Sequence, residues 1–205
     1  MWYRCFFAIV FLFISYSGYS QWEYKKFFSN KISTTSSGEK IDASVWGDSR
    51  RIKTCPELQY SWFSAGKVIT TQGGYSGRLL NGPYMKYYSN KNLKEQGMYY
   101  KGIRDGRWTM WNANGSLNSI TEWKKGLRHG NFFIFDSTGL LLRKGKYRKD
   151  KLYGSVYDMS VPDTITSVYY KRGKPIVRKS PFAKIEKLIP RFLIKKIKNK
   201  FHEEF

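Results

Sequence analysis

The chain has 205 residues, enough for one domain with short extensions. Its 18% aromatic residues and its mean hydropathy of −0.56 predict a folded protein that keeps a polar face, not a disordered chain. A formal net charge of +22 favours anionic partners over cationic ones: lipid head groups, acidic envelope polymers, nucleic acid or an acidic protein.

The first residues are typical of a secretory signal. Arg4 precedes an uncharged, Phe-rich run over 5–14, and the small residues Gly18 and Ser20 stand before a cleavage point. The run is shorter than the roughly 20 residues that span a bilayer. We therefore predict a signal peptide over 1–20 and an exported protein, in the periplasm, outer envelope or extracellular space. An uncleaved N-terminal anchor is the alternative.

Cleavage would leave Cys55 as the single cysteine, which cannot form an internal disulfide. The favoured interpretation is a partly buried small hydrophobe. A nucleophile would need a base and an orienting partner, and the sequence near Cys55 offers neither.

Residues 21–56 form a lead-in to the repeats. The polar stretch 33–38 indicates a loop, and 41–46 is compatible with a short strand. Because terminal repeats lack a neighbour on one side, we expect this segment to cap the first edge of a repeat array.

A repeat dominates residues 57–173. The leading glycines Gly82, Gly106, Gly130 and Gly154 recur at a spacing of 24 residues. Aromatic residues and a leucine recur at fixed offsets from them: Tyr75, Tyr99, Trp123 and Tyr147; Tyr84, Trp108 and Phe132; Tyr87, Trp111 and Phe135; Leu93, Leu117 and Leu141. The glycines and the β-forming residues argue against helices.

Each unit is predicted to be a β-hairpin. Asn114-Gly115 favours a two-residue type I′ turn. The stretches 102–106 and 126–130 indicate a looser second turn. The fold class expected is therefore all-β: an open, twisted antiparallel meander of tandem 24-residue hairpins, followed by a C-terminal amphipathic helical tail.

The two-residue turn fixes a register in which aromatic residues lie opposite small ones. The predicted pairs are Tyr84 with Gly97, Trp108 with Thr121, Phe132 with Gly145, and Tyr99, Trp123 and Tyr147 with Gly82, Gly106 and Gly130. Alternation along the strands then places these aromatics on one face, here called the Trp108 face, together with Leu93, Leu117 and Leu141. We expect this face to be the core, with glycines that let the rings approach the backbone.

The opposite face, here called the Trp111 face, is the candidate binding surface. It should carry Tyr87, Trp111 and Phe135 in a row, with Arg107 and Lys124 among the basic residues that flank them. The alternative is that this row packs against the flanking segments, or is simply the second face of a twisted sheet.

The repeat pattern ends after Gly154. A turn over 161–164 and a return strand over 165–170 complete a shorter hairpin, which 171–175 should break off. The tail, 174–205, has apolar residues at helical spacing with lysines between them, and Pro190 divides it into two helices. Its candidate membrane or partner residues are Phe192, Lys195, Lys196, Ile197, Lys200 and Phe201. They fit an anionic membrane surface, and equally a helix docked on the sheet.

The repeats resemble the MORN family in its bacterial variant form, and most of all the YwqK-type antitoxin repeat proteins. The resemblance covers 57–173, although the first copy lacks its leading glycine and has Glu57 instead. It implies a non-enzymatic scaffold associated with protein interaction, with lipid association or with toxin–antitoxin modules. Export would make the antitoxin role difficult.

The sequence shows no catalytic constellation, and we expect neither an enzyme nor a cofactor or metal site. The two histidines, His129 and His202, are isolated, and no Cys/His spacing suits zinc. The main hypothesis is an exported scaffold for a protein partner or an anionic envelope polymer. A peripheral membrane protein held by its tail is the alternative, an antitoxin-type protein inhibitor is less favoured, and nucleic acid is not expected because of export.

Overall fold

The computed structural model describes residues 30–47, 51–161 and 164–176, and this part of the chain is all β, without a helix. The strands are β1 (Lys31–Ser36), β2 (Glu39–Val45), β3 (Gln59–Ser64), β4 (Lys67–Gln72), β5 (Arg78–Tyr87), β6 (Leu93–Tyr100), β7 (Ile103–Trp111), β8 (Leu117–Lys124), β9 (Leu127–Phe135), β10 (Leu141–Arg148), β11 (Lys151–Leu152), β12 (Gly154–Asp158), β13 (Thr166–Lys171) and β14 (Lys174–Ile176).

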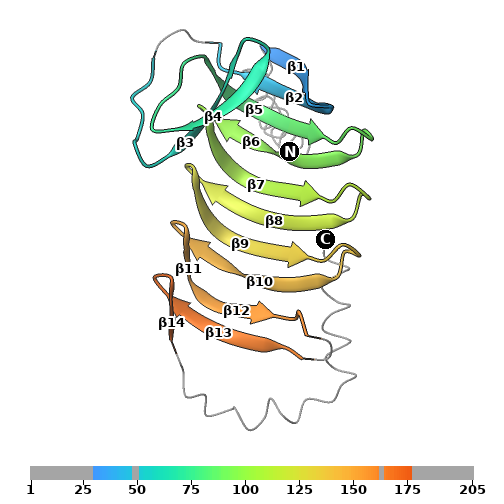
Figure 1. Ribbon diagram of the computed structural model, residues 1–205. Coiled ribbons are helices and arrows are strands. Elements are labelled where there is room, and N and C mark those ends of the chain that lie inside the picture. The colour runs from blue at the N-terminus through green and yellow to red at the C-terminus, as the bar shows by residue number, and fades with distance from the viewer. Residues whose placement is uncertain (1–29, 48–50, 162–163, 177–205) are drawn as a thin grey trace, which may run out of the picture.

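The strands form one open antiparallel meander, as the repeat predicts. The order along the sheet is β1-β2-β5-β6-β7-β8-β9-β10-β12-β13-β14, and β11 pairs with β10 (Figure 1). The predicted signal peptide and residues 177–205 of the predicted tail lie outside the described residues.

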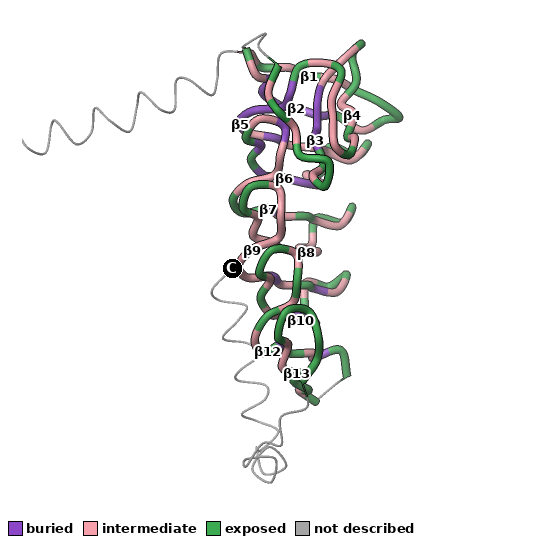
Figure 2. Tube along the Cα trace, turned by 90° about the vertical axis from the view of Figure 1, so that its left-hand side faces the viewer, coloured by how far each residue is buried: buried purple, intermediate pink, exposed green. Residues whose placement is uncertain are grey.

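The lead-in segment caps the repeat array by adding two strands to the N-terminal end of its sheet. The β1–β2 hairpin pairs with β5 through β2, which matches the predicted strand at 41–46. The first repeat copy, β3–β4, departs instead from the main path, with only Trp62 and Phe63 of β3 paired to β5. This hairpin folds over the N-terminal end of the Trp108 face, so the molecule is thick at that end and a single sheet beyond it (Figure 2).

The two kinds of turn are the reverse of the prediction. The turns expected to be looser are two-residue type I′ turns, with positive φ at both central residues: 49° and 81° at Lys101 and Gly102. The turn at Asn114-Gly115 has three residues. The N–H of Asn112 donates to the carbonyl of Ser116 at 2.8 Å, and of the two expected central residues only Gly115 has positive φ, 87°. It follows the three-residue pattern, a type I turn closed by a glycine in the left-handed region.

The predicted register is nevertheless confirmed at all six pairs. The reason is a bulge beside each three-residue turn: Met110 pairs with Ser119 but Trp111 pairs with Leu117, which leaves one extra residue, Asn118. The extra residue in the turn shifts the register by one position, and the extra residue in the bulge shifts it back. Beyond the bulge the strands pair as a two-residue turn would have made them.

The same bulge overturns the predicted side for three leucines. Leu93, Leu117 and Leu141 pair directly with Tyr87, Trp111 and Phe135. They therefore lie on the Trp111 face, not with the aromatics of the Trp108 face, because an extra residue inverts the alternation of side chains.

The four leading glycines have positive φ values, so they are needed for the backbone conformation as well as for ring packing. Their φ values are 113°, 73°, 114° and 78° at Gly82, Gly106, Gly130 and Gly154. At Gly106, the stretch 106–108 of β7 faces the single residue Gly97 of β6, an irregularity that bends the strand. Glycine is favoured there because L side chains rarely adopt these φ values.

Burial is concentrated in three clusters. One lies under the β3–β4 hairpin and includes Leu80, Tyr84, Tyr99 and Trp108. A second, around Tyr60, Trp62 and Leu79, packs on the other side of that hairpin. The third lies on the Trp111 face near the C-terminal end, with Ile120, Phe135, Leu141 and Met159.

The C-terminal end of the sheet continues further than expected. The stretch 171–175 does not break the hairpin: Arg172 and Gly173 form another two-residue turn, with φ of 53° and 82°, and β14 pairs with β13. All three residues of β14 are exposed.

Candidate functional site

The structure extends the predicted aromatic row into a continuous apolar stripe. The bulges place a leucine opposite each aromatic residue. Successive strands therefore contribute an aromatic residue and a leucine in turn to the sheet edge that carries the three-residue turns. In order, the apolar stripe is Tyr87, Leu93, Trp111, Leu117, Phe135 and Leu141.

The two ends of the apolar stripe differ in exposure. Tyr87, Leu93, Trp111 and Leu117 are half-buried. Phe135 and Leu141 are only 5% and 2% exposed, in a cluster with Met159 that Ile165 packs against. The prediction that Phe135 belongs to a binding face is therefore wrong. Its end of the row packs against the segment that follows β12, which belongs to the repeat domain and not to the flanking segments that the alternative interpretation named.

Arg107 and Lys124 are exposed, but they do not gather around Trp111. Lys124 follows Trp123, whose partner on β7 is Gly106, five residues from Trp111 along the strand. At about 3.3 Å per residue that is roughly 16 Å. Arg107 is paired with Glu122 at mid-strand. The structure therefore keeps these two cations away from the apolar stripe.

The Trp108 face carries a feature that the sequence prediction missed, a ladder of arginines stacked on aromatic rings. The guanidinium carbon of Arg104 lies 4.1 Å from the ring centroid of Trp108 and 5.2 Å from that of Trp123. Arg128, one repeat later, lies 4.3 Å from the centroid of Tyr147. The signal for it in the sequence is the repeated Gly-x-Arg of 102–104 and 126–128, whose glycines alone enter the turn prediction.

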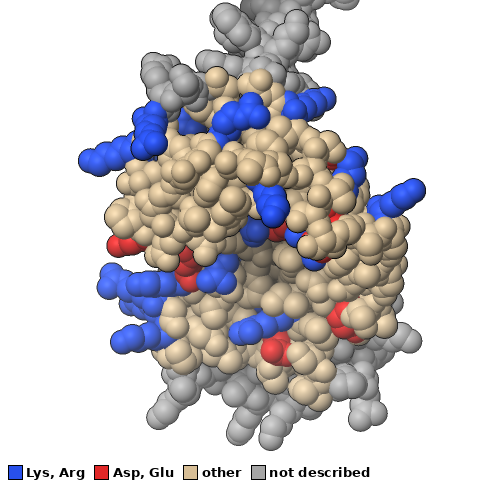
Figure 3. Space-filling model, turned by 45° about the horizontal axis from the view of Figure 1, so that its top comes forward, with Lys and Arg blue, Asp and Glu red and all other residues tan. Residues whose placement is uncertain are grey.

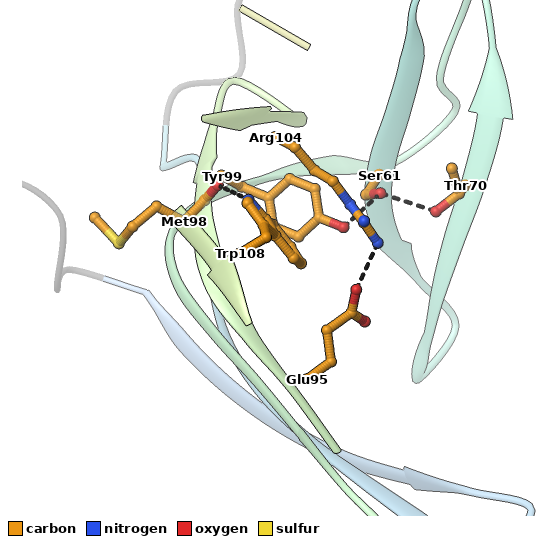
Figure 4. A network of polar contacts seen from close by, with 7 residues as sticks. All are labelled: Ser61, Thr70, Glu95, Met98, Tyr99, Arg104 and Trp108. Atoms are coloured by element: carbon orange, nitrogen blue, oxygen red, sulfur yellow. Dashed lines mark hydrogen bonds and ion pairs between the residues drawn. The ribbon is translucent and has the colours of Figure 1, made fainter. Parts of the chain in front are cut away.

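A polar network anchors the start of this ladder (Figure 4). Nη2 of Arg104 donates to Oε1 of Glu95 at 2.7 Å, in a pair whose carboxylate side chain is only 12% exposed. Oγ of Ser61 on β3 donates to the hydroxyl of Tyr99 at 3.1 Å and lies 2.8 Å from Oγ1 of Thr70 on β4. Burial raises the pKa of Tyr99 above its ordinary value of 10.0.

A cleft of about 520 Å³ lies between the β3–β4 hairpin and the strand ends beside the two-residue turns. Gln59, Ser61 and Thr70 line it from the hairpin, and Tyr99, Arg104, Trp123, Arg128 and Asp150 from the repeats. Figure 3 shows a hollow on this side of the molecule, with basic and acidic side chains at its rim.

Three further features considered in the sequence are a cysteine, a metal site and a membrane-spanning helix. Cys55 is exposed, so its interpretation as a partly buried hydrophobe is wrong. The parts of the chain that the structure describes contain no cluster of His, Cys, Asp and Glu fit to hold a metal ion. Nor is there, within those parts, a helix long and apolar enough to cross a bilayer. The tail residues Phe192 to Phe201 lie outside the described ranges.

Comparison with known proteins adds no assignment. No family model matches the chain, and no curated protein matches it.

Proposed function

We propose that this protein is an exported, non-enzymatic repeat scaffold of the MORN kind that binds a protein partner through the half-buried N-terminal end of the apolar stripe, Tyr87, Leu93 and Trp111. The observation that carries the proposal is the contrast along the stripe. Its C-terminal end is covered by the protein's own Met159 and Ile165, in a cluster against which Leu117 also packs, while Tyr87, Leu93 and Trp111 lie outside that cluster and are half-buried.

The chemistry of the partner follows from that contrast. The covered half shows that the stripe accepts apolar side chains laid across it. A contiguous apolar surface is the usual mark of an interaction site, whereas scattered exposed residues are not. The partner should therefore present an apolar segment. The chain's net charge of +22 favours an acidic protein, or one carried on an anionic envelope polymer.

The test is affinity capture from an envelope fraction with three proteins: the wild type, a Tyr87→Ala/Trp111→Ala variant, and a Tyr100→Ala control. Tyr100 is an exposed aromatic, 47% accessible, near the other end of β6. We expect the same partner to be captured by the wild type and the control, and to be lost with the double variant. A partner retained equally by all three would contradict the proposal, provided that circular dichroism shows all three folded.

The basic tail supports a second function, association with an anionic membrane surface. Its lysines alternate with apolar residues from Phe192 to Phe201, a pattern typical of interfacial helices. Co-sedimentation with anionic and neutral liposomes distinguishes the two functions. Binding to anionic vesicles alone, weakened by salt and lost when 181–205 are removed, would favour the membrane, while the tail-less protein should keep its protein partner if the scaffold function holds.

A further inference from the structure

The cleft on the Trp108 face is a separate site, since it opens on the side of the sheet opposite the apolar stripe. We infer that it binds one or two sugar residues of an uncharged polysaccharide or oligosaccharide. Its volume of about 520 Å³ lies within the range of small-molecule sites. The inference does not depend on the proposed protein partner.

The charges that line the cleft balance each other, which favours an uncharged ligand. Arg104 is paired with Glu95 at 2.7 Å, and Nε of Arg128 donates to Oδ1 of Asp150 at 3.0 Å. Glu95 lies outside the lining, so the charged residues that line the cleft are Arg104 and Arg128 against Asp150 and Glu57. A polyanion would meet these carboxylates in spite of the protein's overall positive charge, and a polycation would meet the two guanidiniums.

The polar groups of the cleft include donors and acceptors in close proximity. Each guanidinium uses one N–H in its carboxylate pair, and a planar guanidinium has five. Asp150 and Glu57 offer acceptor oxygens, while Gln59 and Thr70 offer groups of both kinds. A sugar hydroxyl donates one hydrogen bond and accepts others, so adjacent hydroxyls suit an arginine and a carboxylate held side by side.

Trp123 supplies the apolar part of the wall. The indole is half-buried and lines the cleft, where it can contact the C–H face of a sugar ring. Arg104 lies 5.2 Å from its centroid and helps to fix its orientation. The indole N–H is buried and has no acceptor among the described residues.

The experiment titrates the ¹⁵N-labelled protein with cellohexaose, chitohexaose and maltohexaose, and with hexagalacturonate as the anionic comparison. The readouts are the Trp123 indole resonance, assigned from a Trp123→Phe variant, and calorimetry. We expect at least one neutral hexasaccharide to shift that resonance and to bind with a Kd of about 1 mM or tighter. Trp123→Ala and Arg128→Ala should each weaken binding about tenfold or more.

Trp111→Ala, on the opposite face, is the matched control and should leave saccharide affinity unchanged. If Trp123→Ala fails to fold, Gln59→Trp tests the same point, because it fills the cleft from an exposed position of β3. The inference is overturned if no neutral hexasaccharide binds, if hexagalacturonate binds more tightly than all of them, or if Trp111→Ala weakens binding as much as Trp123→Ala.

Discussion

Glycine meets two different physical needs in this protein. At Gly97 an added Cβ would lie 2.3 Å from Cδ2 of Trp108, and at Gly145 it would lie 2.8 Å from Cε1 of Phe132. At Gly106 and Gly154 a Cβ would meet nothing within 4 Å, but φ is +73° and +78°. The first pair therefore makes room for a ring, and the second permits a left-handed backbone.

Gly97→Ala tests the first need. Because the indole of Trp108 is 2% exposed and packed on all sides, it cannot move away, and we expect a loss of roughly 1–3 kcal/mol in unfolding free energy. Gly74→Ala is the matched control, since a Cβ there meets nothing within 4 Å and φ is not positive. Urea denaturation measures both variants. Equal stabilities would show that the sheet absorbs the clash.

Two aspartates should make stability depend on acid pH. A hydroxyl donated by Thr138 lowers the pKa of Asp136, and one donated by Ser160 lowers that of Asp158, both from an ordinary value of 3.8. A lowered pKa in the folded state adds stability above the unfolded value, and this is lost as pH falls through the folded pKa. We expect stability to decline below about pH 4.

The contribution of Asp136 to this decline can be isolated with Asp136→Asn. The amide can still accept from Thr138 but does not titrate. The decline of unfolding free energy between neutral and acid pH should therefore be shallower than in the wild type. Parallel pH profiles would rule Asp136 out as a source of the effect.

At the scale of the element, the two-residue turns are stabilised by a side chain from the preceding hairpin. Oδ1 of Asn81 accepts the N–H of Lys101 at 3.0 Å, and Oδ1 of Asp105 accepts that of Lys125 at 2.9 Å. The equivalent residue for the next turn is His129. In that turn Oδ1 of Asp150 instead accepts the N–H of Arg128 at 2.9 Å. The two central residues of the turn, Lys149 and Asp150, have positive φ values of 52° and 62°, as in the other two-residue turns.

His129→Asn should supply an acceptor for the backbone N–H of Lys149, for which the described residues show none. The amide oxygen would occupy the place that Asn81 has two repeats earlier, without the charge that an aspartate would bring near Asp150. We expect thermal or urea unfolding to show a gain of about 0.5–1.5 kcal/mol, the net value of one hydrogen bond. His129→Ala, which adds no acceptor, should give no gain, and a similar gain in both variants would refute this explanation.

At the scale of the whole molecule, stability should be graded along the sheet. The N-terminal end has the β3–β4 hairpin packed between two clusters, whereas β13 and β14 are mostly exposed (Figure 2). In repeat arrays each unit contacts mainly its neighbours, so local opening follows local burial. We expect hydrogen exchange to be slowest in β5–β7 and fastest in β13–β14. Uniform protection from β5 to β14 would mean a single cooperative unit.

The sequence by itself determined the class of fold and the pairing of the strands. A glycine and its aromatic partners at a spacing of 24 residues define a unit, and alternation within the unit identifies the Trp108 face. Even a wrong turn length left the register correct, because the extra residue of the three-residue turn is offset by the bulge at Asn118, so that Trp108 still pairs with Thr121.

Only the tertiary structure decided the side for the leucines, the position of the first copy and the cleft. Whether Asn114-Gly115 closes a two- or three-residue turn depends on a bulge at Asn118, and a local motif is compatible with both. The β3–β4 hairpin leaves the main sheet because β2 takes the place beside β5, a competition between distant segments. The cleft between Ser61 and Arg128 exists only once that hairpin has folded over the repeats, and no periodic pattern within one strand encodes such a contact.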